Sequence, residues 1–216
     1  MRRSKTGRES LASALPGIKN LKEAIMENKG SRGGREGKSC LVDPITDPAD
    51  IERIKRLLRD NPRNFALFVC GINNGLRIGD LLSLKVGDVK GLKPGEAVQL
   101  TEKKTGKRNV FMVNHAVHRA LKNYLGEARL SDRDKLFPIG KVRAHQLVKE
   151  WTKDAGLKGN YSTHSLRKTW GYHMRTKYGA GFEVIAKRFN HSSPAVTMRY
   201  LGIQDKEVND LLMNEI

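Results

Sequence analysis

The spacing of apolar residues over the second half of the chain predicts a mainly helical fold. From residue 115 onward, apolar side chains recur every three or four residues, which places them on one face of an α-helix. Helices with such apolar faces bury them by packing against one another. The predicted helices cover residues 115–127, 144–155, 164–178, 182–189, 194–200 and 204–214.

The first half of the chain adds further helices and one small β-hairpin. Asp47 followed by Pro48 is typical of a helix start, because an aspartate caps the first turn and proline fits its first position. The fold class is therefore predicted as mainly α with a small antiparallel β-sheet, that is, α+β. The elements expected here are helices around residues 48–58, 64–73 and 80–84, and strands around residues 98–100 and 109–113.

The charge of the chain indicates an anionic partner. Lys and Arg total 41 against 23 Asp and Glu, for a formal net charge of +18. Such a positive field attracts nucleic acid first and an acidic membrane surface second. No apolar run reaches the length of a membrane span, and the first ten residues lack the apolar stretch of a secretory signal. We therefore expect a soluble, cytoplasmic protein without a membrane partner.

Composition divides the chain into an arm and a compact domain. Residues 1–40 hold ten Lys or Arg against four Asp or Glu, and residues 30–38 are rich in glycine. This composition predicts a basic, flexible N-terminal arm over residues 1–43 and a compact domain over residues 44–216. Cys40 and Cys70 are far apart and lie in no metal-binding motif, so neither a disulfide framework nor a zinc site is expected.

Three short motifs carry residues suited to phosphate chemistry. His164 and Arg167 are three residues apart on a predicted helix and share one face, where both can approach the same phosphate. His191 precedes Tyr200 by nine residues. Arg77 lies at a helix junction, with Asp80 three residues later to brace the guanidinium or the fold around it. Each motif alone is more typical of a solvated surface, and only their combination is informative.

Taken in order, these residues resemble the tyrosine recombinase or phage integrase family. The resemblance spans about residues 44–216 and includes the nine-residue step from His191 to Tyr200. It departs from the family at Asn190, where a glycine is usual before the histidine, but asparagine tolerates the left-handed turn expected there. The resemblance implies the catalytic-domain fold of DNA breaking-rejoining enzymes. The matching positions are Arg77, Lys104, His164, Arg167, His191 and Tyr200.

The resemblance also assigns a role to each matching residue. Tyr200 is the nucleophile that forms a 3′-phosphotyrosyl link, and His164 is the base that takes its proton. Two arginines, Arg77 and Arg167, clamp the phosphate oxygens, and His191 adds a hydrogen bond. Lys104 protonates the departing 5′ oxygen, and Asp80 is placed in support. No ATP, metal ion or other cofactor is expected, since the covalent link keeps the phosphodiester energy.

The expected partner is double-stranded DNA, held by a homotetramer on two duplexes as in this family. The tip of the basic hairpin is suited to reach into a groove, and the basic arm to follow phosphates or enter a minor groove. The residues expected to contact DNA are Lys103, Lys107, Arg108, Arg2 and Arg3.

Two other functions share these sequence features. A type IB topoisomerase uses the same set of residues to relax supercoils, and a DNA-binding accessory protein keeps the fold without catalysis. The residues at the site do not separate a recombinase from a topoisomerase. Forty basic, glycine-rich residues are too few for the core-binding domain that recombinases usually carry, so the chain is either a fragment or a minimal recombinase. The initial Met and the basic arm favour a minimal recombinase.

Overall fold

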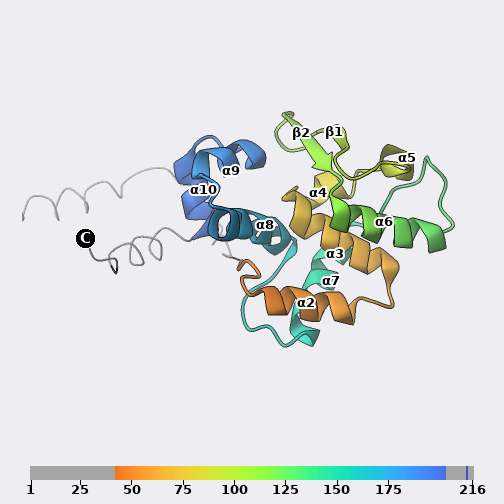
Figure 1. Cartoon of the computed structure of the whole chain (residues 1–216), viewed down its shortest axis with the longest axis horizontal. Helices are drawn as coiled ribbons and strands as arrows, with labels where there is room; N and C mark the ends of the chain where they lie inside the picture. Colours follow the sequence, from red (N-terminus) through yellow and green to blue (C-terminus); the bar gives the residue numbers. More distant parts are fainter. Residues whose placement is uncertain (1–41, 203–212, 214–216) are drawn as a thin grey trace, which may run out of the picture. The chain divides into compact units, whose positions relative to one another are not determined.

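The structure, a computed structural model, describes residues 42–202 and residue 213. Within these residues the chain is mostly helical and has one two-stranded antiparallel sheet (Figure 1), which confirms the predicted fold class. The elements are α2 (Pro48–Leu57), α3 (Pro62–Asn74), α4 (Ile78–Leu81), α5 (Val86–Val89), β1 (Ala97–Thr101), β2 (Arg108–Met112), α6 (His115–Glu127), α7 (Lys141–Asp154), α8 (Thr163–Tyr178), α9 (Phe182–Phe189) and α10 (Pro194–Leu201).

Most of the predicted elements have the expected limits. Helices α6 and α9 begin and end where apolar periodicity places them, whereas α7 begins at Lys141, three residues before the predicted start. The short helix α5 was not predicted. The predicted N-terminal arm up to residue 41, with Arg2 and Arg3, and most of the predicted helix 204–214 lie outside the described residues.

Local capping explains where several helices begin. The Asp47 side chain accepts a hydrogen bond from the Ala49 amide at 2.8 Å, as its position before Pro48 predicts. Asn114 caps α6 in the same way, accepting from the Val117 amide at 2.9 Å. Each cap satisfies a backbone donor that has no partner within its own helix.

The core consists of two groups of buried side chains. The larger group includes Phe68 of α3, which packs edge-on against Trp151 of α7 with ring centroids 6.2 Å apart. The smaller group is formed by Ile185, Phe189 and Leu201, which join α9 and α10 to one end of α8 (Figure 1). This smaller group fixes the part of the chain that carries the predicted nucleophile.

The hairpin places a basic turn next to the core. Strands β1 and β2 pair in register from Ala97 opposite Met112 to Thr101 opposite Arg108. The turn is closed by two backbone hydrogen bonds of 2.9 Å, from the Glu102 amide to the Lys107 carbonyl and from the Gly106 amide to the Glu102 carbonyl. The turn therefore holds its lysines at a defined place at the tip of the hairpin.

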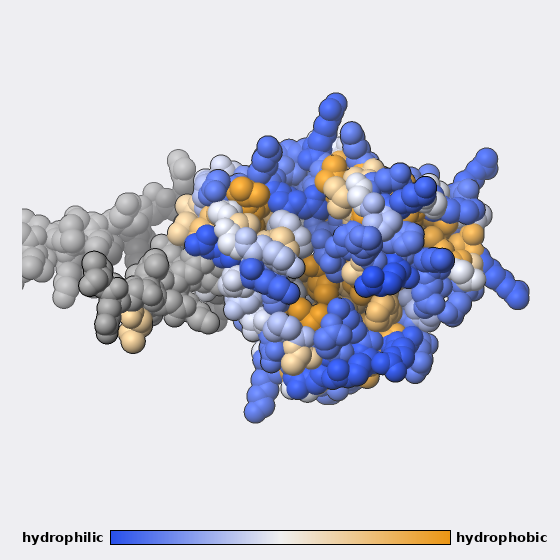
Figure 2. Space-filling model, in the orientation of Figure 1, coloured by the Kyte–Doolittle hydropathy of each residue, from blue (hydrophilic) through white to orange (hydrophobic). Residues whose placement is uncertain are grey.

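The surface is strongly hydrophilic on the face drawn in Figure 2, with long polar side chains projecting from it and small apolar areas between them. Among the described residues, no helix combines the length and the apolar character that a bilayer span needs. A polar, basic surface suits contact with an anionic polymer.

Gly75 is a position where the fold requires glycine. It ends α3 with φ +58°, and a Cβ there would lie 2.8 Å from Cε3 of Trp170. We expect Gly75→Ala to lower the free energy of unfolding by about 2–4 kcal/mol, because left-handed strain and overpacking add. Gly91→Ala is the matched control, since Gly91 has φ +81° with no atom within 4 Å of a Cβ. We expect Gly91→Ala to lower the free energy of unfolding by about 1 kcal/mol, as measured by denaturant titration. Equal losses of unfolding free energy in the two variants would contradict the role of the Trp170 contact.

Candidate active site

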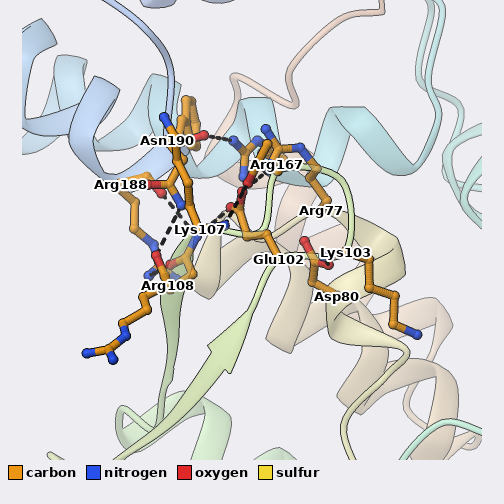
Figure 3. Close-up of polar contacts among 12 residues, drawn as sticks. Arg77, Asp80, Glu102, Lys103, Lys107, Arg108, Arg167, Arg188 and Asn190 are labelled. Atoms are coloured by element: carbon orange, nitrogen blue, oxygen red, sulfur yellow. Dashed lines mark hydrogen bonds and ion pairs between the residues drawn. The ribbon is translucent and has the colours of Figure 1, made fainter.

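Arg77 lies at the junction between α3 and α4, where the chain leaves Gly75 and turns into a new helix. Its Nη1 donates to Oε2 of Glu102 at 2.5 Å, and its side chain remains 20% exposed (Figure 3). Among the described residues its guanidinium has no other hydrogen-bond partner. Since a guanidinium carries five N–H donors, Arg77 keeps donors available for an anion.

Arg167 is a buried cation of the site, in the second turn of α8, and the next residue, Lys168, is also buried with its Nζ 5.1 Å from the centre of the Tyr200 ring. It donates from Nη1 to the Gly75 carbonyl and from Nη2 to the Phe189 carbonyl, each at 2.6 Å. Its guanidinium carbon lies 4.2 Å from the centre of the Phe189 ring. Burial lowers the pKa of Arg167 to about 10, so the group stays charged at neutral pH. Arg167 thereby joins α8 to the junction that carries Arg77 and to the end of α9.

Tyr200, on α10, has its hydroxyl buried without a hydrogen-bond partner among the described residues. Its ring packs edge-on against the rings of His191 and Phe189, with centroids 5.2 and 5.6 Å away. Burial raises the pKa of Tyr200, while the charges of Arg167 and Arg77 and the approach of the Arg167 guanidinium to the hydroxyl act in the opposite direction. The phenol is therefore neutral at rest and lies where two guanidinium charges favour its phenolate form.

His191 follows the left-handed turn that the family resemblance implies at Asn190. Asn190 ends α9 with φ 52° and ψ 34°, and it is the only non-glycine with positive φ in the described part of the chain. Nδ1 of His191 lies 2.9 Å from the hydroxyl of the fully buried Thr197. Burial, followed by the charges of Arg167 and Arg77, lowers the pKa of His191 to about 4. This imidazole is neutral at pH 7, and with Thr197 donating to Nδ1 it can donate from Nε2.

His164 is exposed in the first turn of α8, on the helix that carries Arg167. Partial burial lowers its pKa, and the charges of Arg167, Arg77 and Lys104 lower it further. A neutral imidazole surrounded by cations is able to accept a proton. The charge of His145, on α7, also acts on His164.

The hairpin tip carries the predicted lysines, all of them exposed. The charge of Lys104 acts on His164 and lowers the pKa of that imidazole. The Lys103 amide donates to Oδ1 of buried Asp80 at 3.0 Å, so Asp80 holds the hairpin, and the carboxylate that contacts Arg77 is Glu102. Lys103, Lys107 and Arg108 are exposed.

Comparison with known proteins identifies the family of the chain. Residues 46–207 match the sequence model of the phage integrase family. The chain belongs to this family. The chain is also similar to the probable integrase/recombinase YoeC of Bacillus subtilis (strain 168), with 35% identity over 175 residues that cover 76% of this chain and 92% of that protein. The chain is therefore a tyrosine-type site-specific recombinase.

Solved recombinases share the fold. XerA recombinase is 19% identical with a TM-score of 0.65, over 82% of this recombinase and 66% of XerA. A lambda integrase dimer bound to a COC' core site is 16% identical with a TM-score of 0.59, over 85% of this chain and 56% of lambda integrase. The recombinase thus spans about half to two thirds of the length of these solved chains.

Among the residues at the site of this recombinase that were not singled out from the sequence are Glu102 and Arg188, which each make several polar contacts. Glu102 is 1% exposed and accepts from Arg77, Thr105 and Asn109. Arg188, on α9, donates from Nε to the Asn74 carbonyl at 3.0 Å and from Nη1 to Oδ1 of Asn109 at 2.7 Å. The only sequence signal for Glu102 is that it is the one acid in a basic hairpin turn; Arg188 carries none.

The role of His164 as base, which the family resemblance implies, predicts a pH profile for this recombinase. A base acts in its neutral form, so lowering its pKa moves the acid limb of the rate profile to lower pH. We expect the apparent second-order rate of covalent adduct formation to reach half its plateau below about pH 6.5, the usual imidazole pKa. His164→Gln should lose this limb together with most of the rate. A half-maximal rate above that pH in the wild type would contradict the assignment.

Proposed function

We propose that this recombinase cleaves and rejoins double-stranded DNA through Tyr200. The Tyr200 hydroxyl oxygen bonds to a backbone phosphorus, and the bond from phosphorus to the 5′ oxygen breaks. The phenol proton passes to His164, and the departing 5′ oxygen takes a proton from Lys104. Arg77, Arg167 and His191 stabilise the charge on the non-bridging oxygens. The freed 5′ hydroxyl, or a 5′ hydroxyl of a second duplex, later attacks the phosphotyrosyl phosphorus. This attack releases Tyr200 and reseals a strand.

The observation that carries this proposal is the environment of the Tyr200 hydroxyl. It is buried, without a partner among the described residues, in the field of Arg167 and Arg77. The two guanidinium groups that favour the phenolate are the groups with which a phosphate would bind, so DNA binding and activation of the nucleophile share the same cations. The neutral form of His191 suits it to donate a hydrogen bond without adding charge.

We further propose that the hairpin tip and the N-terminal arm contact the DNA backbone around the cleaved phosphate. Lys103, Lys107 and Arg108 are exposed on the hairpin, and Arg2 and Arg3 belong to the basic arm. Recombination joins strands from two duplexes, so we propose a homotetramer assembled on DNA as the active form. The net charge of +18 supports a strong, salt-dependent contribution of phosphate contacts to binding.

The proposal is tested by trapping the covalent intermediate. The full chain is incubated with supercoiled and genomic DNA in the presence of EDTA and is then denatured in detergent. Fragments that stay attached to protein are sequenced to find the preferred site. A second duplex carries this site and a nick beside the cleaved phosphate. Cleavage of this duplex releases a short fragment, which diffuses away and cannot be rejoined, so the covalent adduct accumulates. Failure to find any adduct over this range of DNA would refute the proposal.

A further inference from the structure

The buried carboxylate of Glu102 lies where three parts of the active site meet. Glu102 directly follows β1 and is 1% exposed. Its Oε2 accepts from Nη1 of Arg77 at 2.5 Å and from the Thr105 hydroxyl at 2.6 Å, and its Oε1 accepts from Nδ2 of Asn109 at 2.8 Å. One side chain thus connects the α3–α4 junction, the hairpin turn and β2 (Figure 3).

Glu102 is ionised at neutral pH. Its burial opposes ionisation, but hydrogen bonds from Thr105, Asn109 and Asn190 and the charge of Arg77 outweigh burial and lower its pKa to about 2. The negative charge of Glu102 also acts on Arg167, Arg188 and His191. It therefore offsets the mutual repulsion of the arginines before DNA is bound.

The two contacts of Oε2 are of different kinds and reach different catalytic groups. The contact with Arg77 uses one donor of the guanidinium, which fixes its orientation and leaves the other donors free. The contact with Thr105 is within the turn, one residue beyond Lys104. Since loop tips move more freely than strands, a hydrogen bond from the turn to a buried anion restrains the position of Lys104.

We propose that Glu102 is a positioning residue for DNA cleavage, which couples the guanidinium of Arg77 to the hairpin turn that carries Lys104. The coupling brings the phosphate clamp and the proton donor to the same phosphate as one preformed unit. This inference rests on the proposed function, because it assigns Lys104 to the leaving 5′ oxygen.

Glutamine cannot replace Glu102 without losing a contact. A glutamine has one acceptor oxygen, whereas Oε1 faces the Asn109 amide and Oε2 faces Arg77 and Thr105. The Asn109 amide cannot turn to match, because its oxygen accepts from the Val110 amide at 2.9 Å and from Arg188 at 2.7 Å. Glu102→Gln therefore releases either Arg77 or the pairing with β2.

The test compares cleavage rate and DNA affinity in single-turnover reactions on the nicked duplex. A misplacement of about 1 Å can cost about 100-fold in rate, so we expect Glu102→Gln to cleave about 10- to 100-fold more slowly. Its Kd for DNA should stay within about twofold of the wild type, because Glu102 contacts no DNA. Glu102→Asp, which keeps the charge, should recover part of the rate. Glu127→Gln is the matched control, an exposed glutamate with the same charge change and an expected wild-type rate.

A second variant tests the coupling without disturbing the core. Thr105 is exposed on the turn, so Thr105→Val removes its hydrogen bond to Glu102, and the longer one of 3.3 Å that it accepts from the Lys107 amide, without unfolding the domain. Cleavage is compared on the ordinary duplex and on one with sulfur at the bridging 5′ position, a leaving group that needs no protonation. We expect Thr105→Val to slow cleavage of the oxygen substrate by about 10-fold and to leave the sulfur substrate at the wild-type rate.

Either of two results would overturn the inference. One is a wild-type cleavage rate for Glu102→Gln or for Thr105→Val on the oxygen substrate. The other is an equal loss of cleavage rate on the oxygen and sulfur substrates for Thr105→Val. That result would show that the contact between Glu102 and Thr105 does not act through Lys104. A wild-type chain that forms no adduct at all would instead refute the proposed function, so the two failures are distinct.

Discussion

Tyr200→Phe is expected to form no covalent adduct with DNA, a loss of at least about 1,000-fold, because the variant has no oxygen to attack phosphorus. DNA affinity should be unchanged, since the arginines and the hairpin remain. Folding stability should be equal or higher, because the hydroxyl that is removed is buried without a partner among the described residues. Denaturing gels, filter binding and denaturant titration measure the three quantities.

Tyr178→Phe is the matched control for this variant. Tyr178 ends α8 and is 65% exposed, so removal of its hydroxyl should change neither adduct formation nor stability. An adduct that persists in Tyr200→Phe would show that Tyr200 is not the nucleophile. If it also disappeared in Tyr178→Phe, the nucleophile would be Tyr178.

Arg167→Lys is expected to give the second largest effect, on both cleavage and stability. A lysine has no planar fork to reach the Gly75 and Phe189 carbonyls together, so at least one buried carbonyl loses its partner. We expect the free energy of unfolding to fall by about 1–3 kcal/mol. Cleavage should fall by roughly 100- to 1,000-fold, as when one donor to a developing oxyanion is lost.

Arg133→Lys controls for the exchange of arginine for lysine at an exposed position. It should match the wild type in unfolding and in single-turnover cleavage. If Arg167→Lys cleaved DNA as fast as this control, Arg167 would have no part in the phosphate clamp.

The sequence allowed most of the fold to be predicted because the relevant signals are local. Apolar periodicity marked α6 and α9, and the pair of Asp47 and Pro48 marked the start of α2. The left-handed turn at Asn190 was implied by the family resemblance, and asparagine tolerates the positive φ that it needs. Each of these features depends on a few neighbouring residues.

The interior of the site could not be predicted, because its contacts join distant parts of the chain. Arg188 donates to a carbonyl 114 residues away, and Arg167 to one 92 residues away. The sequence around Glu102 is typical of a solvent-exposed acid in a basic turn. In the structure, however, Glu102 is buried and paired with Arg77. Asp80 was expected to brace Arg77 or the fold around it, and its hydrogen bond is to the backbone of the hairpin. Periodicity and composition carry no information on such pairs.

The most direct test of the account is to map the residue that carries the DNA. The adduct is digested with nuclease and trypsin and analysed by mass spectrometry. Trypsin cleaves after Arg199, so the account predicts a modified peptide of residues 200–206 with a nucleotide joined through its 3′ phosphate to Tyr200. A nucleotide on any other residue, or one joined through a 5′ phosphate, would contradict it.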